Sequence, residues 1–160
     1  MKLHAEVFFT KIENSEVIYF RDHLDLSYKS KDPDLYVIKV VENYAYKLKA
    51  EPGDLIIHST SWRCDSVNLI VLTYIVYSDY LDFSTKKAKK IKVKDLRITT
   101  SEDVNKPKPI EISELHIVSH GLRHVSYLVK NDPLFKKRLK AGTIGAFKEI
   151  DAVLAGKITS

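Results

Sequence analysis

The first thirty residues of the chain contain two apolar runs, each followed by a polar segment. Residues 3–10 (LHAEVFFT) and 16–20 (EVIYF) are rich in apolar and aromatic residues, and a polar KIENS segment separates them. Because strands favour such residues and hairpins need a polar turn, we predict that the two runs form a β-hairpin. The polar stretch RDHLDLSYKSKD that follows predicts a loop.

Two longer segments carry apolar residues at helical spacing. The first begins at Asp32, which can cap a helix with Pro33 at its first position, and it ends before Glu51-Pro52-Gly53. The second spans residues 111–130 and ends at Asn131-Asp132-Pro133. A basic helical turn at 134–140 and a helix around 143–154 are expected to complete the chain.

The middle of the chain predicts three more strands. Residues 55–62 and 67–77 are joined by a short polar segment, and the second run is apolar on both faces, which is typical of a central strand. Residues 91–99 alternate with lysines and predict an edge strand, followed by a linker at 101–109. The order ββαβββαα over residues 1–160 predicts a single α+β domain, in which two or three helices pack on a largely antiparallel sheet of about five strands.

Composition narrows the class of protein. The chain has 160 residues, of which 44% are hydrophobic and 29% charged, and these values are typical of a soluble globular domain. A single cysteine, Cys64, rules out a disulfide within the chain and suits a reducing compartment. Because no segment resembles a signal peptide or is long enough to span a bilayer, we expect a cytoplasmic protein without a membrane partner.

Basic residues permit an anionic partner. The formal net charge is +5, and six lysines lie between Lys86 and Lys94, with a second basic cluster at residues 136–140. Phosphate backbones attract such clusters, but this run lacks the interleaved aromatic residues that stack on bases. We interpret it as a solvated loop and edge strand, and binding of nucleic acid through Lys86–Lys94 is the less favoured alternative.

The segment HSTSWRC at residues 58–64 places polar and aromatic groups directly after three aliphatic residues. Alternation along a strand predicts that His58, Thr60 and Trp62 share one face, and that Arg63 lies on the other. The hydroxyl groups could hold an anion by hydrogen bonds. The alternative is that the strand simply becomes polar where it leaves the core.

A second unusual segment, LHIVSHGLRH, places His116, His120 and His124 at intervals of four residues. In a helix these residues form a row along one side, and adjacent pairs could chelate zinc. The HExxH pattern is absent, so the usual general base of a zinc protease is missing. Arg123 within the same segment could instead clamp an anion, and packing at the margin of a buried helix face is a third interpretation.

The tetrad His58-Ser59-Thr60-Ser61 resembles one half of the signature of the two-histidine phosphoesterases. In that family two His-x-Thr/Ser tetrads face each other, with histidines as acid and base and hydroxyls on the phosphate. The segment HIVS at 116–119 has Val118 in place of the second hydroxyl, so the resemblance covers four residues. It implies acid–base chemistry on a phosphoester.

These patterns together predict a pocket between the 55–62 strand and the 111–130 helix for a small anionic or phosphorylated ligand, with hydrolysis of a phosphoester as the reaction. We assign acid–base roles to His58 and His120, and ligand contacts to Thr60, Trp62, Arg123, His116 and His124. No cofactor is predicted, and zinc is the alternative that the histidines leave open. The second class is a non-enzymatic interaction domain, such as a homodimer formed through the aromatic-rich sheet.

Overall fold

A five-stranded sheet forms the centre of the molecule. The computed structural model describes residues 2–26, 32–97 and 113–158, with side chains as far as Leu154. The strands are β1 (Lys2–Glu13), β2 (Glu16–Asp25), β3 (Ile56–Ser66), β4 (Leu69–Tyr77) and β5 (Lys89–Lys92), in the spatial order β3-β4-β1-β2-β5. β1 runs parallel to β4, whereas β1–β2, β2–β5 and β3–β4 pair antiparallel.

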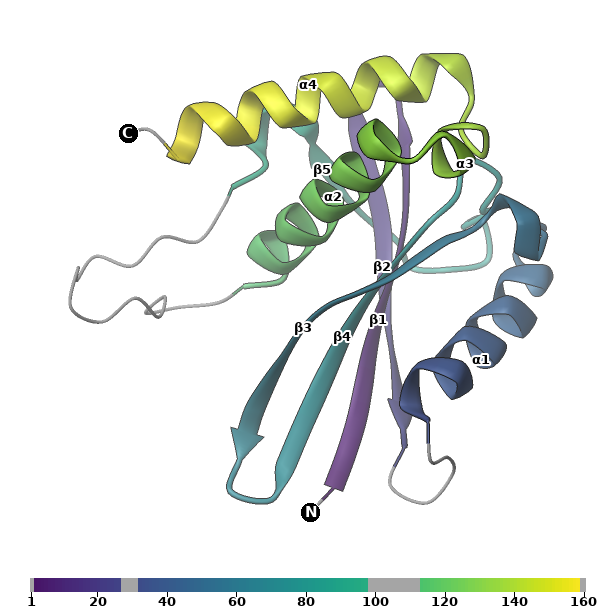
Figure 1. Cartoon of the computed structure of the whole chain (residues 1–160), viewed down its shortest axis with the longest axis vertical. Helices are drawn as coiled ribbons and strands as arrows, with labels where there is room; N and C mark the ends of the chain where they lie inside the picture. Colours follow the sequence, from purple (N-terminus) through teal and green to yellow (C-terminus); the bar gives the residue numbers. More distant parts are fainter. Residues whose placement is uncertain (1, 27–31, 98–112, 159–160) are drawn as a thin grey trace.

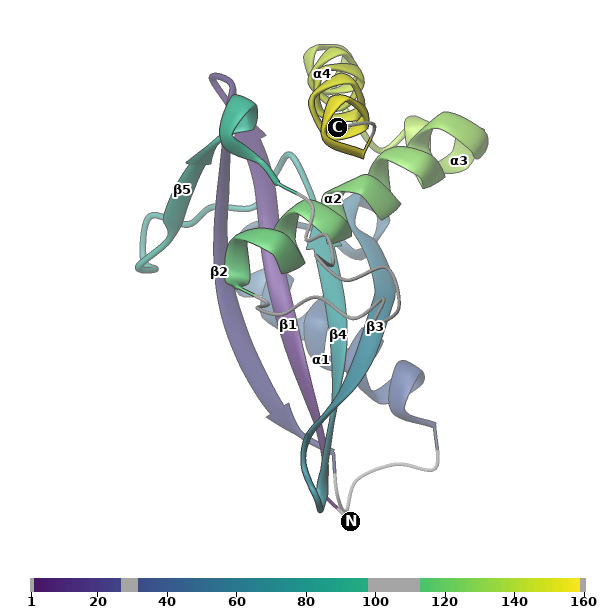
Figure 2. The same cartoon turned by 90° about the vertical axis from the view of Figure 1, so that its left-hand side faces the viewer.

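Helices cover both faces of this sheet. α1 (Pro33–Lys47) packs on one face, and α2 (Glu114–Asn131) and α4 (Ala141–Ile158) pack on the other, joined by the short α3 (Pro133–Lys136). Single 3-10 turns, η1 (Pro52–Asp54) and η2 (Val93–Asp95), precede β3 and follow β5. In Figures 1 and 2, α2 and α4 lie over one end of the sheet, and β1, β3 and β4 extend well beyond α2 at the other end.

Two hydrophobic cores result from this layering. The core under α1 is rich in aromatic residues, among them Phe9 and Phe20, whose rings stack at 4.8 Å. The core under α2 and α4 receives the apolar stripe of α2 and includes Tyr77 and Phe147. A strand between two cores must be apolar on both faces, which explains the continuous apolar run of β4. The aromatic residues of the sheet are therefore largely occupied by packing within the chain.

The predicted α+β class, the approximate order of elements and the mostly antiparallel sheet are confirmed. The predicted helix cap at Asp32 is also confirmed, because its carboxylate accepts a hydrogen bond from the amide of Leu35 at 3.2 Å. The first hairpin turns at Asn14 and Ser15, whose φ values of 50° and 59° suit a two-residue turn. None of the helices described is long and apolar enough to cross a membrane.

Two predicted elements differ from the structure. The segment after residue 20 is not a loop at first, because β2 continues to Asp25 and Arg21 and His23 pair with Phe8 and Glu6 of β1. The edge strand is shorter and earlier than predicted, since β5 ends at Lys92 and η2 follows it. The predicted linker at 101–109, the end of the predicted strand at 98–99 and the start of the predicted helix at 111–112 lie outside the described residues.

Candidate functional site

Three histidines from two distant segments meet at the contact between β3 and α2. Nε2 of His58 on β3 lies 3.1 Å from Nδ1 of His124 on α2, and Nε2 of His124 lies 3.1 Å from Nε2 of His120. The ring centroids are 5.1 Å apart in the first pair and 4.5 Å apart in the second. We name these three residues the histidine row.

A glycine on α2 allows the helix to lie close to the sheet at this point. A Cβ atom at Gly121 would stand 2.5 Å from Cδ1 of Ile75 on β4. Ile75 is the partner of His58 in the β3–β4 register. Since Gly121 lies between His120 and His124 in sequence, the close approach at Ile75 also brings the two helix histidines near His58.

A pocket of about 340 Å³ opens beside the histidine row. His58, Arg123, His124, Tyr127 and Leu128 line it, and we name it the histidine pocket. Among the residues that the structure describes, Arg123 forms neither an ion pair nor a hydrogen bond through its side chain. The lining of the pocket therefore includes two histidines and an arginine whose charge no described carboxylate neutralises, while the surface that these residues expose to the pocket is mostly apolar.

The environment of the row favours neutral imidazoles. Burial lowers the pKa of His58 below its usual value. Burial and the charge of Arg123 lower the pKa of His120. Burial also lowers the pKa of His124, and the neighbouring His120 and His58 lower it further. A neutral imidazole has one donor and one acceptor nitrogen, so the row can form a chain of hydrogen bonds and can accept a proton.

The ring nitrogens of the histidine row face one another in pairs. His124 directs its two ring nitrogens at two different histidines, so the three rings do not converge on one point. Across the described part of the chain, no three His, Cys, Asp or Glu side chains are arranged to hold a metal ion.

A β-bulge in β3 changes which side chains share a face. Ser59 pairs with Tyr74 and Ser61 with Thr73, so Thr60 is the extra residue of the bulge. The prediction that Trp62 shares a face with His58 is therefore wrong, and Arg63 instead lies on the face of His58. Trp62 pairs with Leu72, on the face of the sheet that α1 covers, and is 67% exposed.

Two further predicted site residues take part in local structure. Thr60 donates a hydrogen bond from its hydroxyl group to the carbonyl oxygen of Thr73 at 3.3 Å. His116 lies at the first turn of α2, where its Nδ1 is 2.9 Å from the hydroxyl of Ser113. Of the predicted residues, His58, His124 and Arg123 line the histidine pocket, and His120 contacts His124 without lining the pocket. Thr60, Trp62 and His116 also lie outside the pocket.

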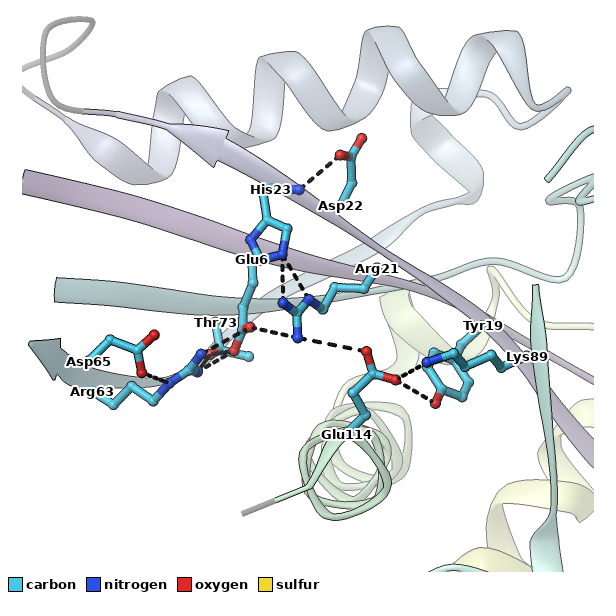
Figure 3. Close-up of polar contacts among 10 residues, drawn as sticks. All are labelled: Glu6, Tyr19, Arg21, Asp22, His23, Arg63, Asp65, Thr73, Lys89 and Glu114. Atoms are coloured by element: carbon cyan, nitrogen blue, oxygen red, sulfur yellow. Dashed lines mark hydrogen bonds and ion pairs between the residues drawn. The ribbon is translucent and has the colours of Figure 1, made fainter. Parts of the chain in front are cut away.

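A buried carboxylate with two arginines lies on the same face of the sheet, and the sequence analysis missed it. Glu6 in the middle of β1 is fully buried. Figure 3 shows Arg63 and Thr73 on one side of its carboxylate and Arg21 on the other. Arg63 donates hydrogen bonds to both oxygens, to one of them at 3.2 Å. Thr73 donates at 2.7 Å, and Arg21 lies 3.8 Å away.

The network continues from the sheet to the first turn of α2 (Figure 3). Glu114 accepts hydrogen bonds from Lys89 at 2.6 Å and from the Tyr19 hydroxyl at 3.1 Å, and Arg21 lies 3.7 Å from it. Burial and the Glu114 carboxylate raise the pKa of Tyr19 to about 12. The network therefore joins residues of all five strands to the first turn of α2, the helix that carries His120 and His124.

Burial alone would raise the pKa of Glu6, but hydrogen bonds from Arg63 and Thr73 and the charges of both arginines hold it below its usual range. Glu6 is thus ionised at neutral pH. The sequence held one signal of it, because a glutamate inside the apolar run LHAEVFFT is rarely buried without a partner. The partner itself could not be found, since the bulge at Thr60 is what turns Arg63 toward Glu6.

The two lysine clusters do not form one surface. Figure 2 shows β5, which lies within the first cluster, and α3, which ends at the start of the second, on opposite sides of the molecule. Lys89 in the first cluster is paired with Glu114.

Comparison with models of protein families, with curated proteins and with solved structures finds no match for this chain.

Proposed function

We propose that the chain binds a small anionic ligand, of the size of a phosphate monoester, in the histidine pocket, and that binding takes up a proton. The observation that carries this proposal is that Arg123, which has no acidic partner among the described residues, lines one pocket with His58 and His124, and that His124 also contacts His120. A guanidinium group offers forked donors that match phosphoryl or carboxylate oxygens. Arg123 is accordingly the clamp of the proposed site.

Proton uptake follows from the pKa values of the row. All three histidines have pKa values below the usual range, so the row is largely neutral at pH 7. An anion beside them stabilises the imidazolium form and raises these pKa values. Because the rings are hydrogen-bonded to one another, the proton belongs to the row rather than to one residue. Affinity for the anion therefore increases as pH falls from 8 toward 6.

The same arrangement suits hydrolysis of a phosphoester, with His58 as the base. His58 lines the pocket and can accept a proton from a water molecule whose oxygen forms a bond to phosphorus. The bond from phosphorus to the ester oxygen breaks, and the departing alcohol takes a proton back from the row. His124 connects His58 to His120, so the row ends the step with as many protons as it had at the start.

Isothermal titration calorimetry with sulfate and phosphate tests the binding proposal. Sulfate keeps its charge between pH 6 and 8, so tighter sulfate binding at lower pH reports protonation of the protein. Titrations in buffers of different ionisation enthalpy give the number of protons taken up, which we expect to lie between zero and one. Arg123→Gln should weaken binding by about tenfold or more, since a charge-assisted hydrogen bond contributes roughly 1.5–3 kcal/mol.

Lys39→Gln is the matched control, because Lys39 is an exposed lysine of α1, which packs on the other face of the sheet. It removes the same charge and should leave sulfate affinity unchanged. Sulfate binding that is equal in wild type and Arg123→Gln, or that does not depend on pH, would overturn the binding proposal. Hydrolysis is tested separately with chromogenic phosphate esters, and ester turnover that persists in His58→Ala would overturn the assignment of His58 as base.

A further inference from the structure

A second cavity, separate from the histidine pocket, lies between α2, α3 and α4. Its volume is about 360 Å³. Val129 of α2 and Ile144 and Phe147 of α4 provide apolar walls, and Val129 and Phe147 are almost fully buried. A cavity of roughly 150 Å³ is enough for a benzene ring, so this one has room for on the order of ten non-hydrogen atoms.

Positive charges from three helices surround these apolar walls. Lys130 of α2, Lys136 of α3 and Lys148 of α4 line the cavity together with a single acidic residue, Asp151. Three lysines and one aspartate give the lining a formal charge of +2. Within the described residues none of the three lysines forms an ion pair, so the excess positive charge is not neutralised by them.

We propose that this cavity binds a small amphiphilic anion, with a carboxylate at the lysines and a short hydrocarbon chain against Val129, Ile144 and Phe147. The apolar walls gain nothing from a bare inorganic ion, whereas a hydrocarbon chain removes apolar surface from water on both sides of the contact. The lysines in turn favour an anionic head over a neutral or cationic one. The site shares no lining residue with the histidine pocket and does not depend on the proposed function there.

Calorimetric titration of the whole chain with octanoate tests the proposal, because octanoate has a carboxylate, an alkyl chain and a size that suits the cavity. The expected dissociation constant is about 1 mM or tighter. Octylamine has the same chain with the opposite charge, and acetate has the same head without the chain. Both should bind at least about tenfold more weakly than octanoate.

Two charge reversals locate the site. Lys148→Glu and Lys136→Glu should each weaken octanoate binding by about tenfold, and the effect should shrink in high salt. Lys39→Glu on α1 makes the same change of net charge on the far side of the sheet and should leave the affinity within about twofold. Ile144→Trp fills the cavity and should abolish binding while circular dichroism and the melting temperature show a folded protein.

The proposal is overturned if octanoate does not bind at several times the expected dissociation constant, if octylamine binds as tightly, or if both charge reversals leave the affinity unchanged. Saturating sulfate should not displace octanoate. The proposal for this cavity and the proposal for the histidine pocket can therefore be refuted independently.

Discussion

Replacement of Arg63 by methionine is the sharpest test of how the buried network is held together. Both oxygens of Glu6 are bonded to Arg63, and Glu6 is fully buried. Methionine keeps the apolar stem of the side chain but removes the charge. The carboxylate then retains the hydroxyl of Thr73 at 2.7 Å and the more distant Arg21 at 3.8 Å.

Breaking a buried ion pair by removal of one partner typically costs about 3–5 kcal/mol. Because Thr73 and Arg21 remain, we expect the lower end of this range, about 3 kcal/mol, for Arg63→Met. For a domain of this size, each kcal/mol lowers the melting temperature by roughly 2–4 °C, so a decrease of about 6–12 °C is predicted. Urea unfolding followed by near-ultraviolet and far-ultraviolet circular dichroism would measure both the loss of stability and the cooperativity.

A second substitution separates loss of the charge pair from loss of packing. In Glu6→Gln/Arg63→Met the buried charge is gone, and the amide oxygen of glutamine can still accept from Thr73. The double variant should therefore recover at least half of the lost stability. A single variant as stable as wild type, or a double variant less stable than the single one, would refute the assignment of Glu6 as a buried carboxylate held by Arg63.

The pH dependence of the same variant has a definite sign. The pKa of Glu6 is lowered in the folded protein, so the stabilisation is complete above the unfolded pKa of about 4.5 and is lost as pH falls through the folded pKa. Without Arg63 the buried carboxyl can be protonated more readily. The destabilisation by Arg63→Met should therefore be largest at neutral pH and shrink on acidification.

The remaining predictions concern the helices and the histidine row. Gly121→Ala should cost about 1–2 kcal/mol, because its Cβ would stand 2.5 Å from Cδ1 of Ile75, and the cost should be smaller in an Ile75→Val background, which lacks that atom; equal costs in a double-mutant cycle would contradict the close approach. Asp32→Ala should cost about 1 kcal/mol in urea unfolding through loss of the α1 cap, and no loss would contradict that role. Since the histidines of the row have lowered pKa values in the folded protein, its free energy of unfolding should rise as pH increases toward the unfolded value of about 6.5, and His120→Gln should flatten that rise; an equal slope in the variant would contradict the shift for His120.

The elements that the sequence predicted well are those with a strong local pattern. The apolar run of β4, the stripe of α2 and the cap at Asp32 each follow from a few neighbouring residues. The sequence analysis did not predict that β2 continues past residue 20, because residues 21–25 are mostly polar and polar runs are typical of loops. These residues pair with β1 in a part of the sheet that extends beyond α2. The parallel pairing of β1 with β4 joins residues about seventy positions apart, and no local pattern contains it.

The candidate site shows the same division. Helical spacing places His120 and His124 together, and the histidine on the neighbouring strand was predicted to share a pocket with them. The bulge at Thr60 could not be foreseen, and that one extra residue decides which way Trp62 and Arg63 point. The role of Gly121 could not be predicted either. This glycine lets α2 lie close to Ile75 of β4, and that contact is visible only in the folded chain.

The most direct test of the proposed function is a two-dimensional 1H–15N NMR titration of the histidine side chains, recorded with and without sulfate. We predict that His58, His120 and His124 are largely neutral at pH 7, titrate as a coupled group below the usual histidine range, and shift together toward the protonated form when sulfate is added. Three independent titrations at ordinary pKa values, with no response to sulfate, would contradict both the hydrogen-bonded row and the anion site built on it.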